Sequence, residues 1–89
     1  MGLVFRPSAD RHGISEARIR EAVASCPLPL VAPAESELQD LLLFLGPDAN
    51  GVPLEVVAVE QTDGNLIVID AMRLRRSLVA DYAEVMRWT

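Results

Sequence analysis

The sequence contains little of what most metal and cofactor sites are built from. It has no lysine, one cysteine (Cys26) and one histidine (His12) among 89 residues. A single cysteine excludes an internal disulfide, and one cysteine with one histidine is too few for a His/Cys metal cluster. Neither a phosphate-binding loop nor a glycine-rich nucleotide motif is present, so no cofactor is expected.

Long hydrophobic runs are also missing. No apolar stretch approaches the roughly 18 residues of a membrane span. The start of the chain, MGLVFRPSADRH, lacks the basic segment and the long apolar core of a signal peptide. We therefore expect a cytoplasmic chain with no membrane association.

The acids and the arginines are segregated along the chain. Residues 1–33 carry four Arg and three acids, residues 34–72 carry eight acids and no base, and residues 73–89 carry four Arg and two acids. The net charge of −5 argues against a protein that coats nucleic acid by bulk charge. Because Arg binds carboxylate or phosphate through paired N–H groups, the two Arg-bearing ends would form one cationic patch if they meet in space.

The stretch from Leu54 to Met72 predicts a β-hairpin. Val, Ile and Leu dominate both arms, which fit strands at Leu54–Glu60 and Leu66–Met72. Between the arms, Asp63-Gly64 suits a two-residue type I′ turn because both residues tolerate positive φ there. The rest of the chain is expected to pack around this hairpin.

The turn sets the register, and the register assigns each side chain to a face. With Asp63 and Gly64 as the loop residues, Val59 faces Val68, and Val57 faces Asp70. Since side chains alternate along a strand, one face is apolar and is expected under the helices: Leu54, Val56, Ala58, Ile67, Ile69 and Ala71. The other face holds two acids and is where function is expected: Glu55, Val57, Val59, Leu66, Val68, Asp70 and Met72.

The remaining elements follow from apolar spacing and from breakers. A helix is expected after the N-cap Ser15, with an apolar stripe of Ile19, Ala22, Val23 and Cys26, and with Arg18 and Glu21 facing water. Pro27 ends this helix. The other expected elements are a short strand at Leu3–Phe5, a helical turn near Ser8–His12, an extended edge segment or loop at Cys26–Pro33, a strand at Leu38–Leu45, and an amphipathic helix from Arg73.

These elements predict a single α+β domain over residues 1–89. It would be a small antiparallel β-meander with the N-terminal and C-terminal helices packed on one of its faces. Whether residues 34–45 form a helix or a strand stays open, because periodicity does not separate the two in a short apolar run.

Glu55 and Asp70 are the acids most suited to a site. They are diagonal neighbours on one sheet face, roughly 7–8 Å apart at Cα. They would serve as an acid/base or arginine-binding pair. Alternatively, each pairs with a nearby cation such as Arg73 or Arg75 at the junction of sheet and helix.

The cations near the last helix allow two interpretations as well. Arg73, Arg75 and Arg76 would hold an RNA phosphate, or would form a solvated helix face. At a helix N-terminus they would oppose the helix dipole. Tyr82 lies on the apolar stripe, where it serves either as a core residue with a polar tip or as a site residue.

His12 and Cys26 are the remaining reactive side chains. His12 precedes a glycine and would act as a general base or merely close a turn. A Cys26–His12 nucleophile pair is conceivable, but the place of Cys26 on the apolar stripe favours a buried core thiol.

Four short motifs, taken together, resemble the BrnT-like toxins of bacteria. They are Arg11-His12-Gly13-Ile14-Ser15 before a helix, Leu45-Gly46-Pro47-Asp48 between strands, Leu54-Glu55-Val56 at the start of the next strand, and Ile69-Asp70-Ala71-Met72-Arg73-Leu74-Arg75 entering the last helix. The resemblance implies a RelE-like fold. It also implies a ribonuclease toxin of a type II toxin–antitoxin pair, neutralised by a small ribbon-helix-helix antitoxin.

The resemblance also implies roles for particular residues. The basic-His-Gly step of the family matches Arg11 and His12, the tyrosine of its last helix matches Tyr82, and an arginine of some relatives matches Arg75. Asp70 and Met72 depart from the pattern. Relatives carry histidine at the first of these positions and arginine at the second, and a carboxylate there would repel phosphate.

Two functional hypotheses follow. The first is a metal-independent endoribonuclease with catalytic His12, Glu55, Arg75 and Tyr82, and with RNA phosphate held by Arg11, Arg73 and Arg76. Its partners would be an RNA substrate and a cognate antitoxin, with a homodimer left open. The second is a catalytically impaired toxin relative that acts as a protein-binding or co-repressor module.

Overall fold

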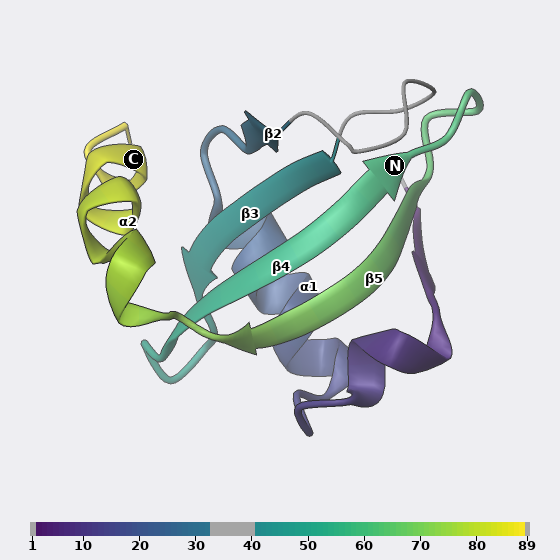
Figure 1. Ribbon diagram of the computed structural model, residues 1–89, viewed down its shortest axis with the longest axis horizontal. Helices are drawn as coiled ribbons and strands as arrows, with labels where there is room; N and C mark the ends of the chain where they lie inside the picture. The colour runs from purple at the N-terminus through teal and green to yellow at the C-terminus, as the bar shows by residue number, and fades with distance from the viewer. Residues whose placement is uncertain (1, 33–40, 89) are drawn as a thin grey trace.

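A five-stranded mixed sheet forms the centre of the protein (Figure 1). The computed structural model describes residues 2–32 and 41–88. The strands lie in the order β1-β5-β4-β3-β2, and they are β1 (Leu3–Phe5), β2 (Leu30–Ala32), β3 (Leu41–Pro47), β4 (Pro53–Glu60) and β5 (Leu66–Arg73).

The pairing of the strands confirms the meander but not a purely antiparallel sheet. β3, β4 and β5 pair antiparallel in sequence order, and β2 adds an antiparallel edge. β1 pairs parallel with β5 at the other edge. The predicted strand at Leu3–Phe5 is confirmed, and the strand expected at Leu38–Leu45 is confirmed from Leu41 onward, since its first three residues lie outside the described ranges.

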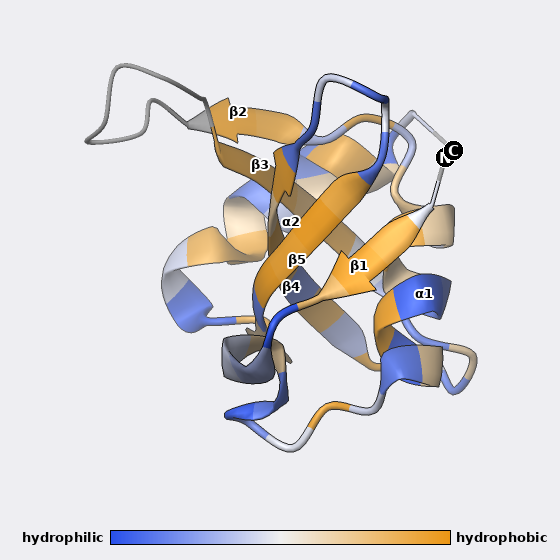
Figure 2. Ribbon diagram, turned by 90° about the vertical axis from the view of Figure 1, so that its right-hand side faces the viewer, coloured by the Kyte–Doolittle hydropathy of each residue, from blue (hydrophilic) through white to orange (hydrophobic). Residues whose placement is uncertain are grey.

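The two helices lie on opposite faces of this sheet (Figure 2). α1 (Glu16–Ser25) packs on β3 and β4, and α2 (Val79–Met86) contacts β3 from the other side. The prediction that both helices share a face is wrong. The segment before α2 is tied to Glu55, which projects away from α1, so the chain leaves the sheet on that side.

Local signals place α1 as expected. The Ser15 hydroxyl accepts a hydrogen bond from the Arg18 backbone N–H at 3.3 Å, which confirms the N-cap. Ile19, Ala22 and Val23 are buried, as the apolar stripe predicts. Beneath them, Gly46 of β3 has no side chain, and a Cβ there would collide with the Ala22 carbonyl. The close approach of α1 to the sheet therefore requires glycine at this position.

The turn of the central hairpin differs from the prediction by one residue. Gln61 donates its backbone N–H to the Asn65 carbonyl at 2.7 Å, so three residues form the loop, and Gly64 takes a φ of 86°. This is a three-residue connection with glycine in the left-handed position rather than a type I′ turn. The predicted pairing of Val59 with Val68 is therefore wrong.

A bulge in β5 restores the predicted register further along. Ala58 pairs with Val68, whereas Val57 pairs with Asp70, which leaves Ile69 as the extra residue. Four residues of the predicted core face are buried as expected: Leu54, Val56, Ala58 and Ala71. The prediction is wrong for Ile67 and Ile69, which are only partly buried. Their neighbours Leu66 and Val68 lie in the core instead. One residue in the turn thus exchanges the faces of half of β5.

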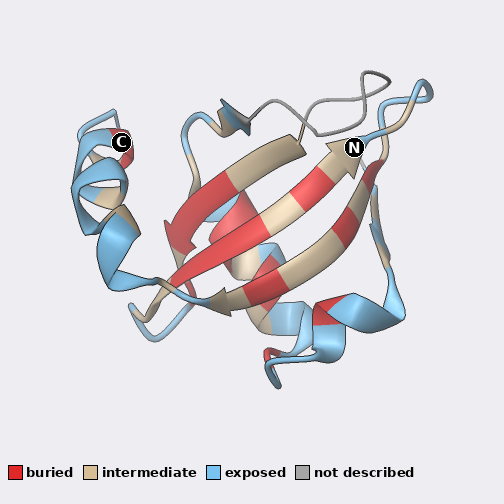
Figure 3. Cartoon of the chain, in the orientation of Figure 1, coloured by how far each residue is buried: buried red, intermediate tan, exposed pale blue. Residues whose placement is uncertain are grey.

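The main core lies between α1 and the sheet (Figure 3). Each fully buried Val, Leu or Ile side chain contributes about 1.5–3 kcal/mol, so this layer supplies most of the stability. Its buried members are Ala9, Ile14, Ile19, Ala22, Val23, Phe44, Leu54, Val56, Ala58, Leu66, Val68 and Ala71.

Two shorter helical turns flank the core. The 3-10 helix η1 (Pro7–Asp10) follows β1, at the place where a helical turn was expected, and η2 (Arg76–Leu78) leads into α2. Within the described part of the chain, no helix is long and apolar enough to cross a membrane.

The loop between β3 and β4 is held by α1 through Asp48, whose side chain is 1% exposed. Its carboxylate accepts hydrogen bonds from the backbone N–H groups of Asn50 and Val52, each at 2.9 Å, and from Arg18 Nε at 2.9 Å. Glu21 accepts a bond from the Ala49 N–H. The expectation that Arg18 and Glu21 merely face water is therefore wrong, because both bind this loop.

We predict that Asp48 makes stability fall in acid. The Val52 N–H and the Arg18 guanidinium lower the pKa of Asp48 below its usual 3.8. A carboxyl group whose pKa is lower in the folded state contributes stability above its unfolded pKa and loses it as the pH falls through the folded value. The Asp48→Asn variant should therefore be less stable at neutral pH and lose less stability in acid, as measured by urea unfolding across the pH range.

The control for this prediction is Glu60→Gln, at the exposed end of β4. It should leave both the stability at neutral pH and its acid dependence unchanged. An Asp48→Asn variant with the same pH dependence as the unaltered protein would show that Asp48 does not hold the loop.

Candidate functional site

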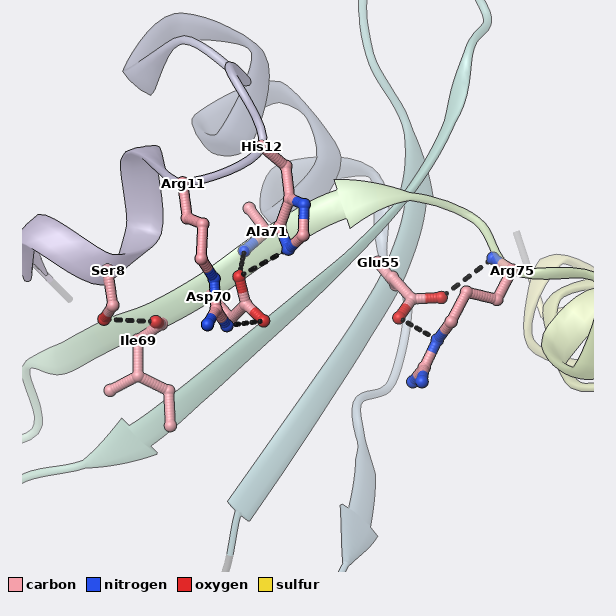
Figure 4. Close-up of polar contacts among 8 residues, drawn as sticks. All are labelled: Ser8, Arg11, His12, Glu55, Ile69, Asp70, Ala71 and Arg75. Carbon is pink, nitrogen blue, oxygen red and sulfur yellow. Dashed lines mark hydrogen bonds and ion pairs between the residues drawn. The ribbon is translucent and has the colours of Figure 1, made fainter.

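The segment after β1 crosses the edge of β5 and carries two of the predicted site residues with it. β1 covers β5 only as far as Val68, to which Arg6 donates its backbone N–H at 3.0 Å. The next carbonyl, that of the bulged Ile69, accepts a hydrogen bond from the Ser8 hydroxyl at 2.6 Å. These two bonds place the residues that follow η1 above the free edge of β5 (Figure 4).

Arg11, His12 and Asp70 meet there, and we call them the Asp70 cluster. Arg11 Nη2 lies 3.2 Å from Asp70 Oδ2, and His12 Nε2 lies 3.4 Å from Asp70 Oδ1. The Ala71 backbone N–H donates to Oδ1 at 3.0 Å. The Asp70 side chain is 19% exposed, while those of Arg11 and His12 are 66% and 37% exposed. The carboxylate is thus enclosed, and the two basic groups around it face solvent.

This arrangement has a definite chemical capacity. The carboxylate faces Nε2 of His12, which favours the tautomer with a proton on Nε2 and a free lone pair on Nδ1. Arg11 uses one of its five N–H donors on Asp70 and keeps the others for a ligand. The Asp70 cluster therefore presents a proton acceptor beside a donor group suited to phosphate.

Glu55 and Arg75 form a second polar pair on the same face of the sheet, under the segment that precedes α2 (Figure 4). Glu55 is 1% exposed, and its Oε1 accepts a bond from Arg75 Nε at 2.7 Å. Its Oε2 accepts a bond from the Arg75 backbone N–H at 2.9 Å. The pair fits the ion-pair alternative, and a carboxylate this buried has no access to a substrate.

The register places Glu55 and Asp70 as predicted, but their partners keep them apart. Glu55 pairs with Met72 and Val57 with Asp70 across the β4–β5 ladder, so the two acids are diagonal neighbours. Glu55 is bound by Arg75, and Asp70 by Arg11 and His12. The two acids therefore serve separate clusters and do not form one acid/base pair.

The other predicted site residues lie away from the Asp70 cluster. Arg73 is opposite Leu54 and so belongs to the α1 face of the sheet, whereas Arg76 lies in η2 and Tyr82 in α2. Within the described part of the chain, none of these three forms a hydrogen bond or an ion pair with the Asp70 cluster. The arginines also precede α2 instead of starting it, so the expected conflict with a helix dipole does not arise.

Two further side chains have shifted acidities caused by burial. Desolvation raises the pKa of the Tyr82 hydroxyl and that of the Cys26 thiol. Cys26 follows the C-terminal end of α1 and His12 precedes its N-terminal end, so a helix of about 15 Å separates them. The structure therefore does not bring together a Cys26–His12 nucleophile pair.

The contact of Arg11 and His12 with Asp70, which assembles the site, was not predicted from the sequence. Arg11, His12 and Asp70 were each identified as candidates, but in separate groups. Only the parallel pairing of β1 with β5 brings residues 11 and 12 over residue 70. The available signal was the polar run Ser8–His12 between a strand and a glycine, which is too short to indicate where it docks.

Comparison with protein-family models, with curated proteins and with solved structures gives no significant match. The resemblance to BrnT-like toxins therefore rests on the motifs alone.

We predict that Arg75 stabilises the fold through Glu55. Replacing Arg75 with Ala removes the bond to Oε1 and leaves a buried carboxylate under-satisfied, which should lower the free energy of unfolding by about 1–3 kcal/mol. Arg87→Ala is the matched control, since it removes an exposed pair with Glu84 and should cost no more than about 0.5 kcal/mol. Urea unfolding measures both, and equal losses in the two variants would contradict the structural role.

Proposed function

We propose that this chain is the toxin component of a bacterial type II toxin–antitoxin pair. It would be a cytoplasmic, metal-independent endoribonuclease with a RelE-like fold, similar to BrnT-like toxins. The observation that supports this is the Asp70 cluster. Its Arg11 and His12 match the basic-His-Gly motif of the toxins, and their exposed guanidinium and imidazole groups both contact the Asp70 carboxylate on β5.

The reaction follows from the roles of these groups. Nδ1 of His12 takes the proton from a ribose 2′-hydroxyl, and the 2′-oxygen attacks the adjacent phosphorus. A 2′,3′-cyclic phosphate forms, and the bond from phosphorus to the 5′-oxygen of the next nucleotide breaks. Water protonates that leaving oxygen. The free donors of Arg11 bind the phosphate oxygens, whose charge grows in the transition state.

Asp70 acts in this proposal as a positioning residue. Its carboxylate orients the imidazole and fixes Arg11 beside it, as a buried carboxylate does for a catalytic histidine elsewhere. The repulsion of phosphate expected from an acid at this position is offset, because Asp70 is bound by two basic side chains and one backbone N–H. The departure of Asp70 from the family pattern is therefore compatible with catalysis.

The proposal changes the set of catalytic residues expected from the sequence. His12 is retained as the base and Arg11 as the phosphate-binding residue. Glu55 and Arg75 become structural, because each satisfies the other under α2. Arg73, Arg76 and Tyr82 are left without a step in the reaction. A cognate antitoxin would inhibit the enzyme by covering the exposed side chains of the Asp70 cluster.

RNA cleavage by the purified protein in the presence of a chelator tests the proposal. We expect His12→Ala to reduce the cleavage rate about 10²–10⁴-fold, and Arg11→Ala to reduce it as well, while Arg87→Ala leaves it unchanged. In cells, expression of the unaltered protein should arrest growth, and expression of His12→Ala should not. Normal growth with intact cellular RNA, or full cleavage by His12→Ala, would overturn the proposal.

A specific observation favours the second candidate, a protein-binding or co-repressor module. α2 covers only part of the sheet face that points away from α1, and Figure 1 looks onto that face. Its partly exposed apolar side chains are Val4, Leu43, Val57, Val59 and Ile67. Exposed apolar area of this kind is typical of interaction surfaces.

Binding to the product of the neighbouring gene separates the two candidates. If the chain is a binding module without activity, Val59→Glu should abolish co-purification with that product, and His12→Ala should leave it intact. Val79→Glu, at an apolar position of α2 that is 54% exposed, serves as the control. A strictly monomeric protein that binds no neighbouring product would exclude this candidate.

A further inference from the structure

A cavity of about 480 Å³ opens between η1 and α1, on the α1 side of the segment that carries the Asp70 cluster. Its volume lies within the range of small-molecule sites, about 300–1,000 Å³. Phe5, Ile14 and Ile19 supply apolar walls, and Arg6, Asp10 and Glu16 supply charged groups. The lining thus combines one aromatic ring with exposed charged groups of both signs.

The fold holds the walls of this cavity in place. Ile14 and Ile19 are 5% and 1% exposed and belong to the main core. Arg20 lies over the Phe5 ring, with its guanidinium carbon 5.1 Å from the ring centroid, and this contact restrains the ring. Arg6 is positioned by its backbone bond to Val68. The cavity is therefore built on β1, η1, α1 and the short connections between them, in which Ile14 is anchored in the core.

The charged groups of the cavity are available to a ligand. Over residues 2–32 and 41–88, the carboxylates of Asp10 and Glu16 accept no hydrogen bond and form no ion pair, and the Arg6 guanidinium has no acidic partner. By contrast, the carboxylates of Asp48, Glu55 and Asp70 are each bound by an arginine. Two free carboxylates and one free guanidinium thus surround the same apolar space.

We infer that this cavity binds a guanine base of the RNA that is cleaved. A guanine offers two adjacent donors, N1–H and the N2 amino group, to a carboxylate, and two acceptors, O6 and N7, to an arginine. The other three bases do not combine two adjacent donors with such an acceptor edge. Single-stranded RNA is commonly recognised by such edge contacts together with stacking on an aromatic ring.

The position of the cavity relative to the Asp70 cluster supports this inference, which rests on the proposed function. Asp10 and Ile14 of its lining each lie two residues from His12. The cavity and the imidazole therefore flank one short segment, and a single-stranded RNA that passes around this segment would place a base in the cavity and a phosphodiester at His12. Asp10 and Glu16 would accept hydrogen bonds from the base, and Arg6 would donate to it.

Binding of guanosine 3′-monophosphate tests the inference without requiring cleavage. In titrations followed by amide NMR shifts, we expect this nucleotide to perturb residues of β1, η1 and the start of α1, and to bind at least about tenfold more tightly than the adenosine, cytidine and uridine 3′-monophosphates. Glu16→Gln should weaken it about tenfold, since the amide replaces one acceptor oxygen by a donor. Asp81→Asn, far from the cavity on α2, should have no effect.

The outcomes also separate this inference from the proposed function. His12→Ala should keep the preference for guanosine monophosphate while losing cleavage. Equal binding of all four nucleotides, no binding, or an unaltered affinity in Glu16→Gln would overturn the inference, even if RNA is cleaved. Selective binding by a protein that never cleaves RNA would support the base site and overturn the ribonuclease. Preferential binding of an arginine-containing peptide would identify a protein partner and overturn the inference.

Discussion

Three ion pairs between the ends of the chain and its middle organise this molecule. Arg18 binds Asp48 and so holds the β3–β4 loop on α1. Arg75 binds Glu55 and holds the segment that leads into α2. Arg11 binds Asp70 and holds the segment after η1 on β5. In each pair an arginine from a positively charged end meets an acid from the negatively charged middle. The acid has a less exposed side chain than its arginine in every case, so each pair supplies the counter-charge that a carboxylate close to the core requires. The segregated charges of the sequence are thus brought together by the fold.

The geometry of the sheet determines where these pairs form. The three-residue turn and the bulge at Ile69 together place Asp70 on the face away from α1. The alternation along β4 places Glu55 on that same face and keeps the apolar residues of β4 under α1. The bulge also lies where β1 ends, so the Ile69 carbonyl is free to accept the Ser8 hydroxyl. A single irregularity therefore corrects the register and provides the attachment point for the segment that carries Arg11 and His12.

The two candidate sites lie on either side of η1. On its sheet side, the Asp70 cluster presents an imidazole and a guanidinium. On its α1 side, the cavity presents an aromatic ring, together with two carboxylates and one arginine that form no ion pair among residues 2–32 and 41–88. Residues 7–12 thus lie between the two proposed sites. On one side, His12 would act on a phosphodiester, and on the other, the cavity would bind the neighbouring base. If the proposed function holds, an acidic protein would act on RNA here because Arg11 and His12 stand together at the surface and the carboxylate beside them is paired.

Local signals in the sequence were enough to predict the Ser15-capped helix and its apolar stripe, the strand at residues 3–5 and the meander. These depend on periodicity, caps and breakers, which act between neighbouring residues. Contacts between distant segments set the face of Ile67 and Ile69, the opposite sides of the two helices, and the partners of the acids. The predicted pairing of Val57 with Asp70 is correct because the longer turn and the bulge offset each other. The parallel pairing of β1 with β5 was also beyond local signals, since it joins residues more than 60 positions apart. The individual site candidates were therefore readable from the sequence, but their assembly into one site depended on contacts between distant segments.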